Sequence, residues 1–218
     1  MKTYLWIKQI LDYLFAAILI IVLSPILLLL AIIIKLDSKG PVLFKQKRIG
    51  KDCVEFNILK FRTMRVDTPS DMPTHLFANS ESFITAPGRF LRKSSLDELP
   101  QLFNILKGEM SFIGPRPALW NQYDLINARE EQAIKSGANA NGVKPGITGW
   151  AQVNGRDELP IDVKANFDGY YARNLSFTLD VKILFMTVFS VLTSKGVSEG
   201  GPKAQAGPKS KNVPKGDE

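Results

Sequence analysis

The feature that most constrains this chain is an apolar run, Tyr13–Ile34, which holds no charged residue over 22 positions. As an unbroken helix it would extend about 33 Å, enough to cross a hydrocarbon core of about 30 Å. Ser24 and Pro25 stand near its middle, and a proline inside a helix removes one hydrogen bond and clashes with the preceding turn. The carbonyl that loses its partner is that of Ile21, and we expect the Ser24 hydroxyl to bond to it. The run therefore predicts two helical halves joined by a break at Ser24-Pro25.

Basic residues flank this apolar run on both sides. Those before it are Lys2 and Lys8, and those after it are Lys35, Lys39, Lys45, Lys47 and Arg48. A helix that spans a bilayer once normally carries its basic residues on the cytoplasmic side only. The flanks favour a re-entrant helix-break-helix, which enters one leaflet and returns, over an ordinary spanning helix. A signal peptide is a further alternative, but the apolar part exceeds the usual length of about 7–15 residues and no A-x-A-like cleavage site follows it.

Composition narrows the range of partners. The formal net charge of +7 indicates an anionic partner, such as phospholipid headgroups or nucleotide phosphates. Nucleic acid is not expected, because the basic residues are not interleaved with aromatic ones as in single-strand binders. The single cysteine, Cys53, excludes an internal disulfide and a cysteine metal cluster, as expected for a cytosolic location. The single histidine, His75, excludes a multi-histidine metal site, and we expect it to lie in a solvent-exposed loop.

The rest of the chain predicts a mixed α/β, mainly helical domain. Apolar periodicity and the positions of glycine and proline place strands at 42–44 and 54–59, helices at 99–106, 118–136 and 181–193, and loops at 64–85, 111–117 and 142–156. The second of these helices should end at Gly137, and the third is either buried or an amphipathic interfacial helix. The glycine-, proline- and lysine-rich segment 196–218 is expected to be a disordered tail.

Asp97 and Glu98 stand in the densest cluster of chemically active side chains. One interpretation is structural, because Ser95 and Glu98 have the spacing of a capping box and acidic residues are favoured in the first turn of a helix. Pro100 favours another interpretation. Proline is best placed at the first helical position, which would leave both carboxylates at the mouth of the helix.

Basic residues near this acidic pair indicate phosphoryl chemistry. Arg92 precedes Asp97 by five residues, and Arg116 lies in a loop with a proline on either side of it, which restricts its backbone. A rigidly held arginine suits bidentate recognition of phosphate oxygens. Lys60 adds a further basic group. Such cations can neutralise a diphosphate while a carboxylate attacks phosphorus.

The combined pattern resembles the monotopic bacterial phosphoglycosyl transferases, which initiate surface polysaccharide and glycoprotein synthesis. The chain looks like the small form, a catalytic unit without an added multi-span membrane domain. The matching segments lie between about residues 10 and 195 and are Ser24-Pro25, Lys60–Met64, Leu91-Arg92, Ser95–Leu102, Asn104, Lys107-Gly108, Gly114–Pro117, Lys144–Arg156 and Leu179–Lys182. The tail after Gly196 lies outside the resemblance.

The resemblance implies that Asp97 is a nucleophile. It would attack the β-phosphate of a UDP-sugar, release UMP and form a sugar-phosphoryl aspartate, from which undecaprenyl phosphate takes the phosphosugar. Glu98 would assist, either as a Mg²⁺ ligand together with Asp97 or as a proton acceptor. The other residues implied in the site are the phosphate-binding Arg92, Arg116 and Lys60, and the substrate-binding Gln152, Arg156, Asp180 and Trp150. Trp150 either stacks on or near the nucleotide or is a plain core residue.

The resemblance also implies a location and a division of the chain. Residues 1–36 would form the re-entrant hairpin and 37–195 a catalytic domain at the cytosolic face of the bacterial inner membrane, with its product passed to downstream glycosyltransferases. Segments 64–69 and 116–123 look most like members that handle N-acetyl deoxyamino sugars in capsule synthesis. Two other functions stay open. One is a non-catalytic membrane scaffold of a polysaccharide assembly complex, and the other is a phosphohydrolase that acts on the same membrane diphosphates.

Overall fold

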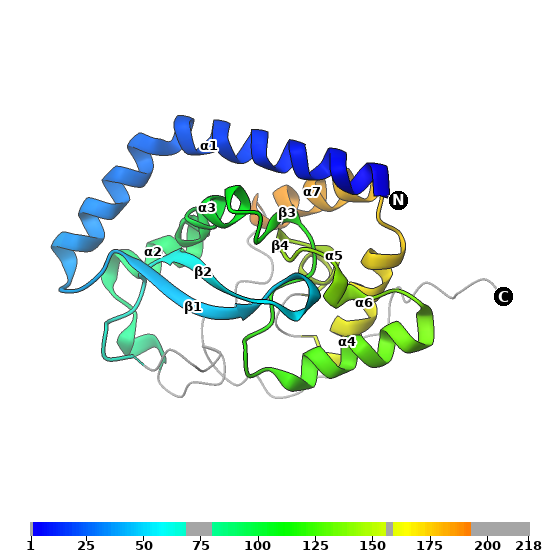
Figure 1. Cartoon of the computed structure of the whole chain (residues 1–218). Helices are drawn as coiled ribbons and strands as arrows, with labels where there is room; N and C mark the ends of the chain where they lie inside the picture. The colour runs from blue at the N-terminus through cyan, green and yellow to red at the C-terminus, as the bar shows by residue number, and fades with distance from the viewer. Residues whose placement is uncertain (1, 69–79, 156–158, 193–218) are drawn as a thin grey trace.

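The computed structural model describes residues 2–68, 80–155 and 159–192. This part is mainly helical, as the sequence predicts, and has two small sheets of two strands each, of which only the first was predicted (Figure 1). The elements in chain order are α1 (Lys2–Asp37), β1 (Leu43–Ile49), η1 (Lys51–Cys53), β2 (Glu55–Phe61), η3 (Ser80–Phe83), α2 (Ala86–Ser94), η4 (Leu96–Glu98), α3 (Gln101–Leu106), β3 (Ser111–Ile113), α4 (Tyr123–Ser136), η5 (Ala140–Gly142), β4 (Gly146–Thr148), α5 (Trp150–Val153), α6 (Ile161–Arg173) and α7 (Phe177–Leu192). His75 and the predicted tail 196–218 lie outside the described residues.

The apolar run forms one continuous helix, α1, with Pro25 inside it. The predicted break is therefore a bend and not an interruption, and Figure 1 shows the ribbon turning partway along its length. The Ser24 hydroxyl donates a hydrogen bond of 2.8 Å to the carbonyl of Ile21, which confirms the expected bond. This bond satisfies the carbonyl that Pro25 leaves without an N–H partner, so the helix continues through the proline.

Both halves of α1 pack against the rest of the protein. Ala16 belongs to a core cluster with Leu102 and Ile105 of α3, while Leu30 and Ile34 belong to a second cluster with Phe61 and Leu91. The opposite face of α1 is exposed and almost entirely apolar, with Leu14, Phe15, Ile18, Ile21, Val22, Leu28, Leu29, Ile32 and Ile33. Within the described residues, α1 is the one helix that is long and apolar enough to cross a membrane.

The two predicted strands are confirmed and extend further than expected. β1 and β2 form an antiparallel hairpin in which Phe44 pairs with Lys60, Gln46 with Ile58 and Arg48 with Phe56. Because paired residues of an antiparallel ladder point to the same face, Arg48, Ile58 and Lys60 share one side of the hairpin.

The predicted loops 111–117 and 142–156 are wrong in part. Each contributes a three-residue strand, β3 or β4, and the two strands pair in parallel. The second segment also contains the short helix α5. Strands of this length show no alternation in sequence, because they are held by a partner about 35 residues away and not by a local pattern.

The local sequence signal for a helix is clear in α4 and weak in α6. α4 ends where predicted, at Gly137, whose φ of 69° is the left-handed conformation that terminates helices. α6 was not predicted, because the residues that it buries include the small Ala165, Gly169 and Ala172, which leave only a weak apolar stripe.

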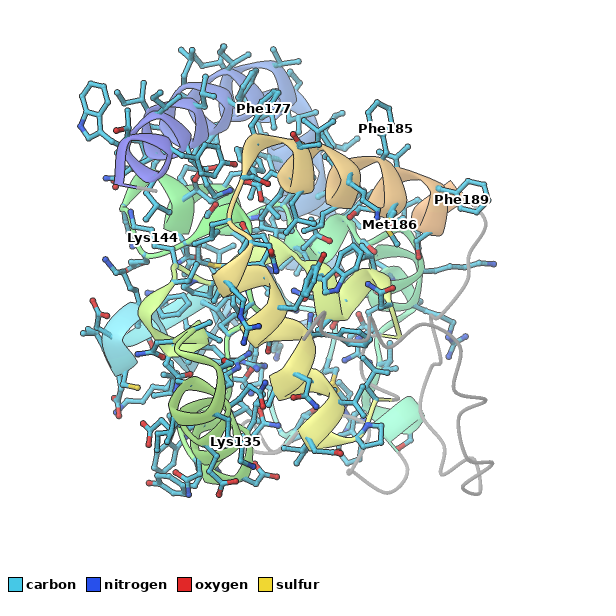
Figure 2. All side chains as sticks on the ribbon, turned by 90° about the vertical axis from the view of Figure 1, so that its right-hand side faces the viewer. Lys135, Lys144, Phe177, Phe185, Met186 and Phe189 are labelled. Atoms are coloured by element: carbon cyan, nitrogen blue, oxygen red, sulfur yellow. The ribbon has the colours of Figure 1, made fainter. Side chains whose placement is uncertain are left out.

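The third predicted helix, α7, has one buried and one exposed side. Leu179 and Ile183 are buried, whereas Leu184, Phe185, Val188 and Phe189 are exposed. Figure 2 shows Phe185 and Phe189 directed away from the body of the protein, on the side where α1 lies, while Lys135 of α4 lies at the opposite end. One face of the helix is therefore buried, and the interfacial alternative stays a prediction for its exposed apolar face.

Candidate active site

Asp97 and Glu98 lie in a short turn, η4, between α2 and α3. Ser95 ends α2 in the left-handed region with a φ of 57°, and within the described residues its side chain makes no capping bond. α3 begins at Gln101 after Pro100. The capping-box interpretation is therefore wrong, because Ser95 directly precedes η4 but its side chain makes no capping bond there. The alternative is confirmed, since both carboxylates precede the helix that follows the proline.

Lys60 connects the acidic pair to the β1–β2 hairpin. Its ammonium donates to Glu98 Oε1 at 2.7 Å. Asp97 is only 9 % exposed, and burial raises the pKa of its carboxyl to about 6, with a further upward contribution from Glu98. The charges of Lys60 and Arg92 lower that pKa and oppose the effect of burial. The structure thus brings together Asp97, Glu98, Lys60 and Arg92, as the sequence predicts.

The raised pKa of Asp97 predicts a pH dependence for any reaction in which this carboxylate is the nucleophile. Below about pH 6 the rate should rise about tenfold per pH unit, and above it the rate should level off, because only the ionised form attacks. For the reaction that the sequence resemblance implies, the measurement is the single-turnover rate of UMP release against pH, without lipid acceptor. In Lys60→Met the rising part of the pH–rate profile should move to higher pH, because the Lys60 charge that lowers the pKa of Asp97 is gone. A rate that levels off already near pH 4, where an ordinary aspartate titrates, would contradict the assignment of Asp97 as the nucleophile.

A small pocket lies next to the acidic pair. Its lining residues are Arg48, Ile58, Lys60, Glu98, Gln101, Arg116, Pro117, Gly146 and Ile147. The predicted site residues Lys60, Glu98 and Arg116 therefore meet in one cavity, although Arg116 is distant from the other two in sequence. Arg48 was not among the predicted site residues, because in the sequence it is one of the basic residues that follow the apolar run. The signal that places it here is the register of the hairpin, which puts Arg48 on the same face as Lys60.

The loop that carries Arg116 is held by backbone contacts. Gly114 N–H donates to the carbonyl of Thr148, and Gly146 N–H donates to that of Pro115, both at 2.9 Å. A Cβ on Gly114 would lie 2.3 Å from the carbonyl oxygen of Lys144, so the two loops approach more closely than any side chain permits. This close approach of the two backbones explains the glycines at positions 114 and 146.

A buried ion pair anchors the same loop from the other side. Arg129 donates to Asp168 at 2.9 and 2.7 Å, and its Nη2 also donates to the carbonyl of Arg116 at 2.8 Å. Both partners of the pair are almost fully buried. α4 and α6 thereby fix the backbone from which the Arg116 side chain projects.

Three of the predicted substrate-binding residues, Asp180, Trp150 and Gln152, lie apart from the pocket lining. Asp180 accepts hydrogen bonds from Tyr4 and Lys8 of α1, both at 2.6 Å, and from Tyr171 at 2.8 Å, so it joins α1 to α7. Trp150 stacks on Tyr170 with ring centroids 5.5 Å apart and packs against an apolar cluster that includes Ile113. These contacts match the core alternative for Trp150.

Gln152 and Arg156 complete the set of predicted substrate-binding residues. The side-chain amide of Gln152 is buried, and within the described part of the chain neither its oxygen nor its nitrogen has a hydrogen-bond partner. A buried amide without partners is costly, so this group suits a polar ligand. Arg156 lies outside the described residues.

Asp97 and Glu98 are also the residues predicted to bind Mg²⁺. Over the ranges that the structure describes, no group of three or more His, Cys, Asp or Glu side chains gathers as a metal site. Mg²⁺ commonly takes only one or two carboxylates and completes its shell with substrate phosphates and water. Two adjacent carboxylates beside a cationic pocket are compatible with that donor set.

Comparison with known proteins identifies the family. A family model described as bacterial sugar transferase matches residues 3–194. The chain is 40% identical over 193 residues to an uncharacterized sugar transferase, EpsL, of Bacillus subtilis, a match that covers 88% of this chain and 91% of that protein. It is 41% identical to a UDP-glucose:undecaprenyl-phosphate glucose-1-phosphate transferase of Xanthomonas campestris, with 86% of this chain and 39% of that protein covered.

A third relative extends the range of donors. The chain is 41% identical to a UDP-N-acetylgalactosamine-undecaprenyl-phosphate N-acetylgalactosaminephosphotransferase of Aeromonas hydrophila, over 88% of this chain and 45% of that protein. The chain therefore spans less than half the length of the Xanthomonas and Aeromonas relatives. The family match covers most of the chain, and the protein belongs to the bacterial sugar transferases, a family of phosphoglycosyl transferases.

Proposed function

We propose that this protein transfers a sugar-1-phosphate from a UDP-sugar to undecaprenyl phosphate and releases UMP. The observation that carries the proposal is the buried Asp97 beside the Lys60–Glu98 pair, at a pocket that Arg116 also lines. The printed names of the Xanthomonas and Aeromonas relatives supply the substrate classes. The lipid-linked product would start a surface polysaccharide or glycoconjugate such as a capsule, and downstream glycosyltransferases would extend it.

In the proposed first step, the Asp97 carboxylate attacks the β-phosphorus of the donor. The bond between this phosphorus and the bridging oxygen breaks, and UMP leaves with the electron pair, so the sugar phosphate stays on Asp97 as an acyl phosphate. Lys60 and Arg116 neutralise the charge that moves onto the phosphate oxygens. In the second step, a phosphate oxygen of undecaprenyl phosphate attacks the same phosphorus and restores Asp97. Mg²⁺ held by Asp97 and Glu98 would add charge neutralisation at the diphosphate.

A panel of UDP-sugars with and without undecaprenyl phosphate tests this function. We expect one UMP per protein molecule without the lipid and continuous UMP release with it, with UDP-N-acetyl deoxyamino sugars the preferred donors. No UMP with any donor would favour the scaffold alternative. Free sugar phosphate in place of a lipid-linked product would identify a phosphohydrolase.

The contacts of α1 support a re-entrant placement in the membrane. Near its start, Lys8 pairs with Asp180 of the catalytic domain. Near its end, the Arg62 guanidinium donates to the carbonyls of Ile34, Ser38 and Lys39. A helix that crossed the bilayer would carry one of its ends about 30 Å away from a domain on the other side. In our proposal both ends stay on the cytosolic face, where a lipid phosphate meets a soluble nucleotide sugar.

Cysteine labelling in intact cells tests this topology. Thr3→Cys and Lys39→Cys, each in a Cys53→Ser background, place exposed thiols at either end of α1. We expect a membrane-impermeant maleimide to label neither in intact bacteria and both after permeabilisation. Labelling of one end from outside would show that α1 spans the membrane.

The exposed apolar side of α7 should also face lipid, because it lies on the same side of the protein as α1 (Figure 2). Phe185 is 72 % exposed on α7, and Ile134 is 84 % exposed on α4 at the opposite end. With an environment-sensitive dye on Phe185→Cys, we expect brominated lipids in the bilayer to quench the fluorescence. The same dye on Ile134→Cys should not be quenched. Equal quenching at the two positions would contradict the proposed orientation.

A further inference from the structure

Arg48 lines the pocket that contains Lys60, Glu98 and Arg116, although it lies on β1, far in sequence from the motifs of the acidic pair. We propose that Arg48 is a substrate-binding residue for the diphosphate of the sugar donor and that Gln46 positions it. This inference rests on the proposed function and adds a residue and a phosphate subsite to it.

The Arg48 guanidinium is held in a fixed orientation. Its Nε and Nη2 donate to Gln46 Oε1 at 3.1 and 2.6 Å, and its Nη1 donates to the carbonyl of Pro117 at 3.1 Å. An arginine oriented by contacts on two sides loses less conformational entropy when it binds an anion than an unrestrained one. Gln46 lies two residues earlier on the same face of β1, so the strand itself sets this geometry.

Arg48 and Arg116 belong to one structural unit. Arg48 forms an isolated antiparallel bridge with Leu119, and the neighbouring Ile49 N–H donates to the carbonyl of Ala118 at 2.9 Å. The end of β1 is therefore paired with the segment that directly follows Arg116. Backbone pairing thus fixes the positions of the two main chains that carry Arg48 and Arg116, which suits recognition of two linked phosphates.

The charge of the pocket matches the donor. Its lining contains the cations Arg48, Lys60 and Arg116 and the carboxylate of Glu98. The formal charges of these four groups sum to +2, and Lys60 and Glu98 form an ion pair. The diphosphate of a nucleotide sugar carries about two negative charges in neutral solution, so the two arginines balance it.

The approach direction favours the soluble donor over the lipid phosphate. The segment paired with Arg48 leads into α4, which lies on the side of the protein away from α1 (Figures 1 and 2). The polyprenol tail enters from the side of α1 and α7. The diphosphate bound by Arg48 and Arg116 should therefore be that of the soluble donor, whose α-phosphate leaves with UMP.

Steady-state kinetics of Arg48→Gln test the assignment. We expect the KM for the UDP-sugar to rise about ten- to a hundredfold, as for the loss of hydrogen bonds to a charged group, and the KM for undecaprenyl phosphate to change less than about twofold. Arg48→Lys should recover part of the loss. The matched control is Lys47→Gln, which removes a positive charge from the neighbouring residue of β1. The Lys47 side chain is 61 % exposed and forms an ion pair with Glu55. It should behave as the wild type. Gln46→Leu should give a smaller rise in the donor KM than Arg48→Gln.

Direct binding of UMP gives a readout without chemistry. In calorimetric titrations we expect Arg48→Gln to bind UMP about ten- to a hundredfold more weakly than the wild type, and Lys47→Gln to bind it equally well. A rise in the KM of the lipid alone, or unchanged UMP affinity in a folded Arg48→Gln protein, would overturn the inference. If the wild type releases no UMP with any donor, the proposed function is wrong, and the UMP titration still decides whether Arg48 binds phosphate.

Discussion

Asp97→Asn should lower the rate of UMP release by at least about ten thousandfold, because an amide cannot supply the negatively charged oxygen that attacks phosphorus. Asparagine has nearly the shape of aspartate, and Asp97 is buried, so the substitution leaves the packing of η4 in place. It also removes a carboxyl whose pKa is raised to about 6 by burial, so the fold should not lose stability at neutral pH. The measurement is single-turnover UMP release with the preferred donor.

Intact-mass analysis separates a lost nucleophile from a lost fold. Wild-type protein incubated with donor alone should gain the mass of one sugar phosphate, and Asp97→Asn should gain none. Glu98→Gln serves as the comparison. It removes an assisting group and the partner of Lys60, so we expect a loss of about a hundred- to ten-thousandfold with the adduct still formed slowly. Normal turnover by Asp97→Asn would show that another residue attacks the donor.

The parts of the fold that sequence reasoning predicted are those with local causes. The bond from Ser24 to Ile21 spans three residues, and the end of α4 depends on one glycine. The parts that it missed depend on partners far along the chain. β3 and β4 exist only because each supplies the other with hydrogen bonds, and α6 buries small residues against α4, which no apolar periodicity reveals.

The same division between local causes and distant partners holds for the candidate active site. Pro100 was enough to place Asp97 and Glu98 before α3, because the effect of proline on a helix is local. The pairing of Lys60 with Glu98 joins residues 38 positions apart. From the residues alone Lys60 was only a further basic group, and its place in the phosphate site was implied by the resemblance to known transferases. Arg48 was missed because a basic residue next to an apolar segment already had an explanation. The structure shows Asp180 bonded to Tyr4 and Lys8, contacts that join α1 to α7, and its role toward the substrate stays a prediction.

Gly114→Ala should lower kcat/KM about a hundredfold, because the added Cβ would lie 2.3 Å from the carbonyl oxygen of Lys144 and 2.9 Å from the amide nitrogen of Gly146. Both contacts are with backbone, so no side-chain rotation relieves them and the two loops must separate. Arg116 lies two residues after Gly114, and a displacement of about 1 Å at a phosphate-binding group is enough for a loss of this size. Overpacking of this kind costs about 1–3 kcal/mol of stability, which leaves the protein folded but lowers its Tm.

The matched control for that substitution is Gly142→Ala, because the same methyl group there meets only the Asn139 side chain, at ordinary contact distances of 3.5–3.7 Å. It should keep both activity and Tm. The comparison discriminates between two explanations of the glycines around Arg116. If close backbone packing of the loops holds Arg116 in place, Gly114→Ala loses activity at temperatures far below its Tm. If Gly114→Ala is fully active while folded, the loops can separate without moving Arg116, and the arginine is positioned by the Arg129–Asp168 pair and by the pairing of β1 with the segment after it.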